Sequence, residues 1–366
     1  MAVKLLEHDK PKHQQLKEYL VNLIESNALP GGSKIPSENE LAEKFRISRH
    51  TVRRAISELV NEGILTTSQG KGTFVNHVLR NNRQSLIIGV ITTYIGDYIF
   101  PSIIRGIDQV LSENGCSIVL GCTNNQFDKE RQCLENLLNQ DIKGLIVETT
   151  KSALPNPNLD LYDEFKKRNI PVLFMHGSYK GYPASSIYED DVEAGYLATR
   201  HLIELGHRRI AGIFKIDDIQ GHARFEGFCR AHKEAGIGLN DKNVMWFDTG
   251  DMQYKFNRQS QDVIIEFLKD CTSLVCYNEQ ISIKVIDIIR DRGIVIPKGL
   301  SLVSFDDSDL AVASEVKMTT VAHPKEKLGI EAANLMLRMI KESDKSFKVR
   351  MTPKLVIRNS TGPVTV

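Results

Sequence analysis

The chain has 366 residues, which at about 100–200 residues per domain predicts two or three domains. Hydrophobic residues make up 41% and charged residues 25%, ordinary values that exclude collagen-like, disordered and disulfide-scaffold chains. Lys and Arg total 47 and Asp and Glu total 46, so the net charge of +1 gives no global attraction to nucleic acid or membranes. A site for a polyanion must therefore be local.

The N-terminus and the cysteines predict a soluble cytoplasmic protein with no membrane partner. The first residues are charged where a secretion signal has an apolar segment. The longest nearly uncharged apolar stretch, residues 85–96, is shorter than the roughly 20 residues that span a bilayer. Six scattered cysteines without a C-x-x-C pair disfavour zinc and redox motifs, and they favour a reducing compartment.

Residues 12–63 show the apolar periodicity of helices and contain almost no strand signal. The first helical segment ends at a Pro-Gly-Gly sequence. Ser37 stands three residues before Glu40, which is the spacing of a capping box, and it opens a second short helix. Ser48 caps a third helix with an apolar stripe, and Gly63 ends that helix.

The chain then changes from helices to strands. Two short β-prone runs around a glycine-rich turn, within residues 64–75, predict a hairpin. A polar segment without apolar periodicity follows, and from residue 86 continuous apolar runs alternate with amphipathic stretches. These runs are 86–92, 117–121, 144–148, 171–175, 209–214, 244–247, 273–277 and 300–305. They predict parallel strands covered on both faces, arranged as two doubly wound lobes with a crevice at the carboxyl ends of the strands.

The third helix carries a local basic cluster. Residues 44–54 contain no acid, and Arg49 and Arg53, four residues apart, share one helical face, while Val52 and Ile56 face the core. Guanidinium groups suit guanine edges and phosphates. A solvated basic face is the alternative explanation of the charge. Two short helices followed by a glycine-rich hairpin nevertheless favour a winged helix-turn-helix.

Residues 34–75 resemble the DNA-binding head of the GntR family. They carry its pattern P-S-E-x-E-L, S-R-x-T-V-R-x-A, L-x-x-x-G and G-x-G-T-F-V. The resemblance implies operator contacts from the second helix, the recognition helix and the wing. These contacts map onto Ser37, Glu38, Asn39, Ser48, Arg49, His50, Thr51, Arg53, Gln69, Gly70, Lys71 and Gly72. Asn39 stands where several relatives have a basic residue, and helix capping is the alternative role for Glu38.

Residues 86–360 resemble the effector-binding domain of the LacI/GalR family. The motifs are D-D-V-E-A-G-Y at 190–196, R-x-x-G-F at 224–228, Y-N-E at 277–279 and S-L-V-S-F-D-D at 301–307. This resemblance implies the two-lobed fold of type I periplasmic binding proteins. A GntR head on such a body is similar to the arabinose-operon repressors of Bacillus-type bacteria, which implies L-arabinose as the effector.

The residues at the predicted strand ends fit a sugar ligand. Sugar hydroxyls need carboxylates, amides and a bidentate arginine, and the ring face needs an aromatic platform. The expected effector contacts are Asp97, Tyr98, Glu148, His176, Arg224, Tyr277, Asn278, Glu279 and Asp306, with Tyr94, Phe100, Lys215, Gln220 and Asp307 at further strand ends. His176 and Glu279 stand where many relatives have Asp. The alternative role is an interlobe salt bridge for Arg224 and a structural hydrogen bond for His176.

We therefore expect an α/β protein with an N-terminal winged-helix DNA-binding domain. The expected boundaries are 1–76 for that domain, 77–85 for a linker, and 86–366 for a two-lobed, doubly wound effector-binding and dimerisation domain. Lobe one is expected at about 86–180 and 318–343, and lobe two at about 181–306 and 352–358.

The predicted function is that of a homodimeric transcriptional repressor that binds palindromic operator DNA and leaves it when a sugar binds. An activator, or a repressor that answers another pentose, a hexose or a nucleoside, is the alternative. A sugar-processing enzyme is a more distant one, because the sequence has no Walker A, G-x-S-x-G or H-E-x-x-H motif. No metal or cofactor is expected.

Overall fold

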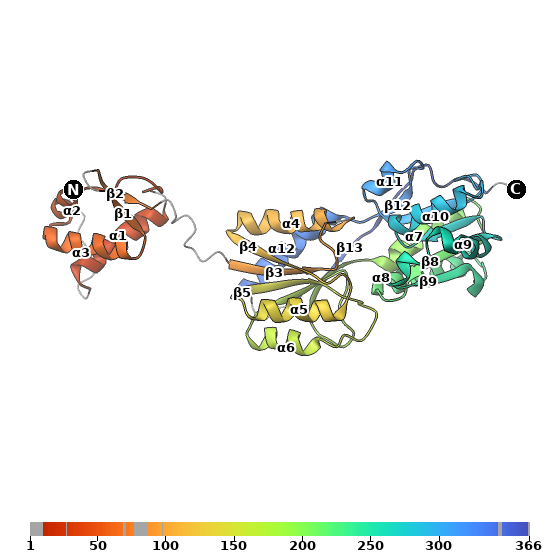
Figure 1. The fold of residues 1–366 in the computed structure, drawn as a ribbon, viewed down its shortest axis with the longest axis horizontal. Coiled ribbons are helices and arrows are strands. Elements are labelled where there is room, and N and C mark those ends of the chain that lie inside the picture. The colour runs from red at the N-terminus through yellow and green to blue at the C-terminus, as the bar shows by residue number, and fades with distance from the viewer. Residues whose placement is uncertain are drawn as a thin grey trace. The chain divides into compact units, whose positions relative to one another are not determined.

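The computed structural model describes residues 10–26, 28–68, 71–76, 86–96, 98–342 and 346–364, without the side chains of Glu25 and Gln253. The chain forms two compact units, Met1–Ser85 and Leu86–Val366 (Figure 1). Three residues assigned above to binding sites, Gln69, Gly70 and Asp97, lie outside the described residues. None of the described helices has the length and apolar character needed to cross a membrane.

The N-terminal unit consists of helices and a two-stranded sheet. Its elements are α1 (Lys12–Glu25), α2 (Glu38–Phe45), α3 (Arg49–Asn61), β1 (Leu65–Ser68) and β2 (Gly72–Val75). The strands are antiparallel, with Leu65 opposite Val75, as the hairpin pattern predicts. The fully buried side chains of Leu16, Val52 and Leu59 join α1 and α3 in one apolar core.

The predicted caps fix where α2 and α3 begin. The Ser37 hydroxyl accepts a hydrogen bond from the Glu40 amide at 3.3 Å, and the Glu40 carboxylate accepts one from the Ser37 amide at 2.7 Å. This reciprocal pair confirms the capping box. The Ser48 hydroxyl accepts from the Thr51 amide at 3.1 Å, so Arg49 occupies the first turn of α3.

The second unit contains two six-stranded sheets, one in each lobe. The strand order is β4-β3-β5-β6-β7-β13 in the first lobe and β9-β8-β10-β11-β12-β14 in the second. The bounds are β3 Leu86–Thr92, β4 Cys116–Cys122, β5 Ile142–Glu148, β6 Val172–Met175, β7 Ser185–Glu189, β8 Ile210–Lys215, β9 Val244–Phe247, β10 Ser273–Cys276, β11 Ser301–Asp306, β12 Thr319–Ala322, β13 Lys348–Met351 and β14 Lys354–Val356. The strands pair in parallel except that β14 is antiparallel to β12.

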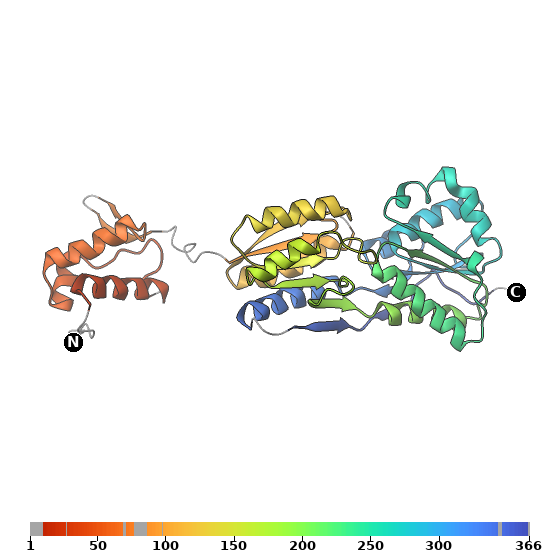
Figure 2. The same ribbon diagram turned by 90° about the horizontal axis from the view of Figure 1, so that it is seen from below.

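Helices cover both faces of each sheet, which explains the continuous apolar runs (Figures 1 and 2). The first lobe carries α4 (Phe100–Glu113), α5 (Phe127–Leu138), α6 (Leu159–Lys167) and α12 (Lys325–Lys341). The second carries α7 (Asp191–Glu204), α8 (Ile219–Glu234), α9 (Gln261–Leu268), α10 (Glu279–Arg290) and α11 (Asp309–Ala313), with short 3-10 turns η2 (Asp241–Asn243), η3 (Asp251–Gln253) and η4 (Arg258–Ser260).

Two of the expected lobe limits need correction. The second lobe was expected from residue 181, but Ser185–Glu189 pairs with β6 and belongs to the first sheet. Conversely, Thr319–Ala322, expected in the first lobe, pairs with β11 in the second sheet, and within 318–343 it is α12 that packs on the first lobe. The chain therefore passes between the lobes directly after β7, directly after β12 and again between β13 and β14.

Candidate functional site

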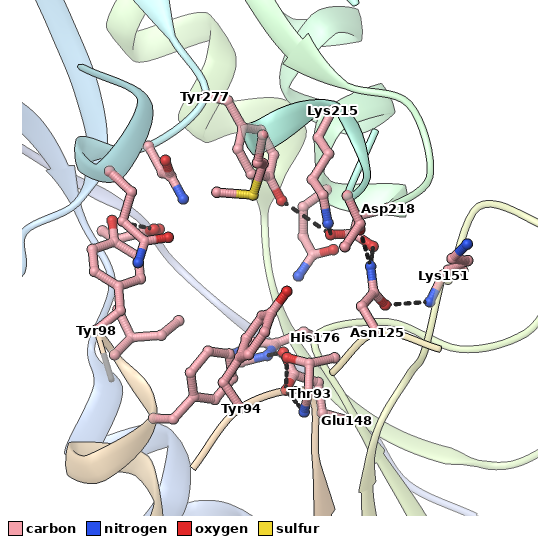
Figure 3. A pocket seen from close by; sticks show the side chains of 18 of the residues that line it. Thr93, Tyr94, Tyr98, Asn125, Glu148, Lys151, His176, Lys215, Asp218 and Tyr277 are labelled. Atoms are coloured by element: carbon pink, nitrogen blue, oxygen red, sulfur yellow. Dashed lines mark hydrogen bonds and ion pairs between the residues drawn. The ribbon is translucent and has the colours of Figure 1, made fainter. Parts of the chain in front are cut away.

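A cavity of about 920 Å³ lies between the two lobes at the carboxyl ends of the strands (Figure 3). The predicted effector contacts among its lining residues are Tyr98, Glu148, His176, Arg224, Tyr277, Asn278 and Asp306. Tyr94, Phe100, Lys215 and Gln220, also placed at strand ends by the sequence, line it too. Each lobe thus contributes polar side chains to one cleft, because the carboxyl ends of the parallel strands of both sheets face it.

Arg224, on α8, is held by two carboxylates of its own lobe. Its Nε donates to Asp191 Oδ1 at 2.8 Å, its Nη1 to the Tyr277 carbonyl oxygen at 2.7 Å, and its Nη2 to Asp306 Oδ1 at 3.4 Å. Burial opposes the charge, but Asp191 and Asp306 outweigh it and raise the pKa of Arg224. Because both ion-pair partners belong to the second lobe, these contacts are not the interlobe salt bridge considered as an alternative.

A chain of buried polar groups crosses the floor of the cavity. Glu148 accepts hydrogen bonds from the Thr93 amide at 2.8 Å and the Thr93 hydroxyl at 2.7 Å. His176 Nδ1 lies 3.1 Å from Glu148 Oε1, and His176 Nε2 lies 2.8 Å from His323 Nε2. Burial lowers the pKa of His176, but Glu148 outweighs it and the pKa is raised overall. Burial and the charge of His176 lower the pKa of His323.

Glu279 does not line the cavity, which corrects the direct effector contact predicted for it. Its side chain is fully buried and accepts from the Asp307 amide at 2.8 Å, the Thr320 hydroxyl at 2.7 Å and the Ser308 hydroxyl at 2.9 Å. As the first residue of α10, it turns toward the loop after β11 rather than toward the ligand space. Burial and the charge of Asp306 raise the pKa of Glu279 to about 7.

Hydrogen bonds join the two lobes on opposite sides of the cavity (Figure 3). On one side, the Tyr98 hydroxyl of the first lobe lies 2.7 Å from Glu279 Oε2 and 2.7 Å from Asp306 Oδ2 of the second. On the other side, Asn125 of the first lobe donates to the Thr249 hydroxyl of the second lobe at 2.7 Å and accepts from the Lys151 amide at 2.7 Å. The Ile219 amide donates to the Ser152 hydroxyl at 2.9 Å. Hydrogen bonds between the lobes therefore bracket the cavity on both flanks.

Several residues that line the cavity were not predicted from the sequence. Asn125 follows the end of β4, Glu189 and Asp191 flank the crossing after β7, and His323 follows β12. The rule that found Glu148 and His176, a polar residue after a strand, also covers these positions. For Glu189, Asp191 and His323 it failed because β7 (SSIYE) and β12 (TTVA) are short and rich in Ser and Thr, so they give little apolar signal. The strand β4 was predicted, but Asn125 lies three residues beyond its end.

Left-handed backbone conformations gather around this cavity. Tyr98, Asn125, Lys151, His176 and Asp306 all have positive φ, between 42° and 97°. Such conformations cost about 1–3 kcal/mol each in non-glycine residues and persist where the surrounding structure imposes them. Their clustering at the strand ends, where the chain turns to aim side chains inward, is typical of a binding site.

In the N-terminal unit, the predicted DNA contacts lie at the start of α2, on α3 and in the wing. Arg53 makes a two-point ion pair with Glu38, with Nε–Oε1 at 3.1 Å and Nη2–Oε2 at 2.8 Å. Arg49 and His50, on the first turn of α3, are exposed. Glu38 therefore does not cap α2, whose capping box is formed by Ser37 and Glu40, and its carboxylate instead holds Arg53 of α3.

Two family models match the chain. Residues 12–75 match bacterial regulatory proteins of the gntR family, and residues 199–361 match a periplasmic binding protein-like domain. The arabinose metabolism transcriptional repressor of Halalkalibacterium halodurans is 42% identical over 362 residues, covering 95% of each chain. That of Geobacillus stearothermophilus is 40% identical over 362 residues, covering 97% of this chain and 98% of that one. The chain belongs to the family of arabinose metabolism transcriptional repressors.

Solved structures share the fold of this repressor's second unit. A LacI family transcriptional regulator from Enterococcus faecium with bound ribose has a TM-score of 0.64 and 25% identity, covering 76% of this chain and 100% of that one. The transcription regulator CcpA of Lactococcus lactis has a TM-score of 0.67 and 22% identity, covering 76% and 99%. The predicted fold is confirmed, and the repressor is a transcriptional regulator rather than an enzyme.

Proposed function

We propose that this repressor controls L-arabinose utilisation genes in the cytoplasm, where it binds palindromic operators as a homodimer and releases them when L-arabinose enters the cleft. The observation that carries the proposal is the 42% identity to an arabinose metabolism transcriptional repressor over 95% of both chains. A match over 95% of the chain includes residues of both units.

The chemistry of the cavity supports a polyol ligand. Glu148 and Asp306 offer acceptors for sugar hydroxyls, and the amide of Asn278 both donates and accepts. Arg224 stacks against the Tyr277 and Phe305 rings, with centroid distances of 5.0 Å and 4.5 Å. This stacking fixes the plane of the guanidinium and therefore the direction in which its remaining N–H groups can donate. A pentose has neither charge nor a large apolar face, so its binding depends on hydrogen bonds between its hydroxyls and carboxylate, amide and guanidinium groups such as these.

Operator recognition is assigned to the N-terminal unit. The proposed base readers are Arg49, His50 and Arg53 on α3, because guanidinium and imidazole donors match the acceptors of guanine in the major groove. Lys71 and Gly72 are the proposed wing contacts that the structure describes. Gly72 has φ 118°, and the Lys34 side chain lies where a Cβ would stand, so the turn needs a glycine here. Ser37, Asn39, Ser48 and Thr51 are proposed to position the head on the DNA backbone through hydroxyl and amide groups, and Glu38 is proposed to act by holding Arg53.

We propose that sugar binding and operator binding compete. A ligand that stabilises the closed lobes shifts the dimer away from the arrangement that fits a palindrome. A coupling free energy of about 1–3 kcal/mol per site weakens operator binding roughly 5–150-fold.

Thermal unfolding of the full chain with a panel of sugars tests the proposal. L-arabinose at 100 times its Kd stabilises a folded protein by about 2.7 kcal/mol. D-arabinose is the matched control, since it has the same groups with the opposite hand. Ribose, xylose, glucose and nucleosides complete the panel, and the ribose arm follows from the ligand of the Enterococcus faecium regulator. Operator binding by fluorescence anisotropy is then measured with the sugar that stabilises. If none of these sugars changes the operator affinity, the proposal is wrong.

A further inference from the structure

Tyr98 of the first lobe contacts two carboxylates of the second lobe with one oxygen atom. Its hydroxyl lies 2.7 Å from Glu279 Oε2 and 2.7 Å from Asp306 Oδ2. Glu279 is the first residue of α10 and Asp306 is the last residue of β11, so the phenol reaches across the cleft to both (Figure 3 shows Tyr98 on the flank of the cavity). Both carboxylates are buried, with exposures of 0% and 5%.

The number of protons in this cluster follows from its geometry. A phenol has one proton, so Tyr98 can donate to only one of the two carboxylates. The other carboxylate oxygen lies at hydrogen-bond distance from a phenol lone pair, and that contact is attractive only if the carboxyl carries a proton of its own. Burial and the two carboxylates raise the pKa of Tyr98, so the phenol keeps its proton. The closed cluster therefore holds one extra proton.

The charged neighbours place that proton on Glu279. Asp306 has Arg224 Nη2 at 3.4 Å from its carboxylate, and Lys325 Nζ lies 2.7 Å from its carbonyl oxygen, so two cations face the Asp306 side of the cluster. The hydrogen-bond partners of Glu279 are instead amides and hydroxyls. The other titratable groups that face the cluster are Asp307, which pairs with Arg358 at 2.7 Å, and Glu189, Asp191, His176 and His323 around Asp306.

We propose that Tyr98 and Glu279 form a proton-holding latch that closes the two lobes and positions Asp306 for the effector. Glu279 acts through Tyr98 and Asp306 and is a positioning residue, because its side chain does not line the cavity. The proposal rests on the proposed function in one respect: the sugar is taken to bind the closed lobes.

The direction of the pH dependence follows from opening the latch. When Tyr98 withdraws, water reaches Glu279, and the pKa of its carboxyl falls from about 7 toward its ordinary value. At a pH between those two pKa values, closing the lobes therefore takes up a proton. For one linked proton, sugar affinity at pH 6 is about tenfold higher than at pH 8, and binding at pH 6 is accompanied by proton uptake.

Calorimetric titration of the full chain with L-arabinose at pH 6, 7 and 8, in two buffers of different ionisation enthalpy, tests the latch. In Glu279→Gln, the amide donates to Tyr98 permanently, as the protonated carboxyl does, so the pH dependence of binding disappears. The change also removes the hydrogen bond that the Ser308 amide donates to Glu279 Oε2 at 3.3 Å, so some affinity is lost at every pH. Tyr98→Phe weakens binding and also removes the pH dependence. Glu226→Gln, an exposed change on α8, is the control and keeps the pH profile of the unaltered protein. A pH-independent affinity in the unaltered protein, or an unchanged slope in Glu279→Gln, overturns the latch.

A measurement without ligand separates the latch from the proposed function. The raised pKa of Glu279 stabilises the fold at low pH, and this contribution is lost as pH rises toward 7. The free energy of urea unfolding should therefore fall from pH 6 to pH 8 more steeply in the unaltered protein than in Glu279→Gln. Parallel unfolding profiles, together with a lobe closure of the ligand-free chain that small-angle X-ray scattering finds equal at pH 6 and pH 8, overturn the latch even where no sugar binds. Absence of sugar binding at every pH, with the unfolding difference present, overturns the proposed function alone.

Discussion

Gly195 in α7 faces the main chain of Arg224 in α8 so closely that a Cβ on Gly195 would lie 2.0 Å from the Arg224 carbonyl oxygen. The reverse contact is equally close, since a Cβ on Gly227 would lie 2.0 Å from the Val192 carbonyl oxygen. The two helices therefore meet backbone to backbone. This contact sets the position of Arg224, whose guanidinium then reaches Asp191 at the start of α7.

Gly195→Ala is expected to separate α7 from α8 and to displace Arg224 from the cavity wall. Overpacking of this kind costs typically about 1–3 kcal/mol, because the carbonyl oxygen that the methyl group meets belongs to the backbone and cannot rotate away. Urea unfolding measures the lost stability, and titration with L-arabinose measures the weakened binding. Gly238→Ala is the control, because a Cβ there meets nothing within 4 Å. Equal stability of the two variants would contradict the role given to this helix contact.

Arg224→Met is expected to abolish the sugar response and to destabilise the second unit. The change leaves Asp191 and Asp306 buried without the guanidinium, and an uncompensated buried charge costs about 3–5 kcal/mol. The double variant Arg224→Met/Asp191→Asn separates the two effects, since it removes one of the stranded charges. It should recover stability in urea unfolding while sugar binding by calorimetry stays absent. Recovery of sugar binding in the double variant would remove Arg224 from the site.

Glu130 should matter for stability and not for the effector. Its fully buried carboxylate on α5 accepts hydrogen bonds from Asn156 and Asn158 Nδ2 at 2.8 Å each, from the Tyr162 hydroxyl at 2.8 Å and from the Tyr179 hydroxyl at 2.5 Å. Glu130→Gln turns one acceptor into a donor that faces other donors, so about 1–3 kcal/mol of stability is lost. Urea unfolding checks the loss, with the half-exposed Glu135→Gln on the same helix as control. An unchanged unfolding midpoint would show that this network stabilises little.

Arg49→Ala tests the DNA reader. If Arg49 binds a guanine with two hydrogen bonds, its loss costs about 1–3 kcal/mol of discrimination between the operator and a scrambled duplex. Anisotropy titrations of both duplexes at one salt concentration give that difference. A loss of the same size on both duplexes would instead indicate a phosphate contact. Glu38→Gln, which weakens the pair that orients Arg53, should change operator affinity without changing the sugar affinity of the second unit.

Local interactions made the helices, the caps and most strands predictable. The capping box at Ser37 and Glu40 lies within four residues of sequence, and the apolar runs of β3, β5, β8 and β11 each fill a strand that is buried on both faces. Periodicity and composition are properties of neighbouring residues, so they are visible in one sequence. The same holds for Glu148 and Asp306, which each end a recognisable strand.

Only the tertiary structure decided which of these residues face the ligand space. Glu279 was predicted to contact the effector because it follows a strand and an asparagine. Its carboxylate instead accepts hydrogen bonds from the Asp307 amide and the Thr320 hydroxyl, which are 28 and 41 residues away. The pairing of β7 with β6 and of β12 with β11 brings three further residues to the cavity: Glu189, Asp191 and His323. The sequence alone does not show which strands pair. A buried polar group binds whatever donors the fold brings to it, and that choice depends on contacts between residues far apart along the chain.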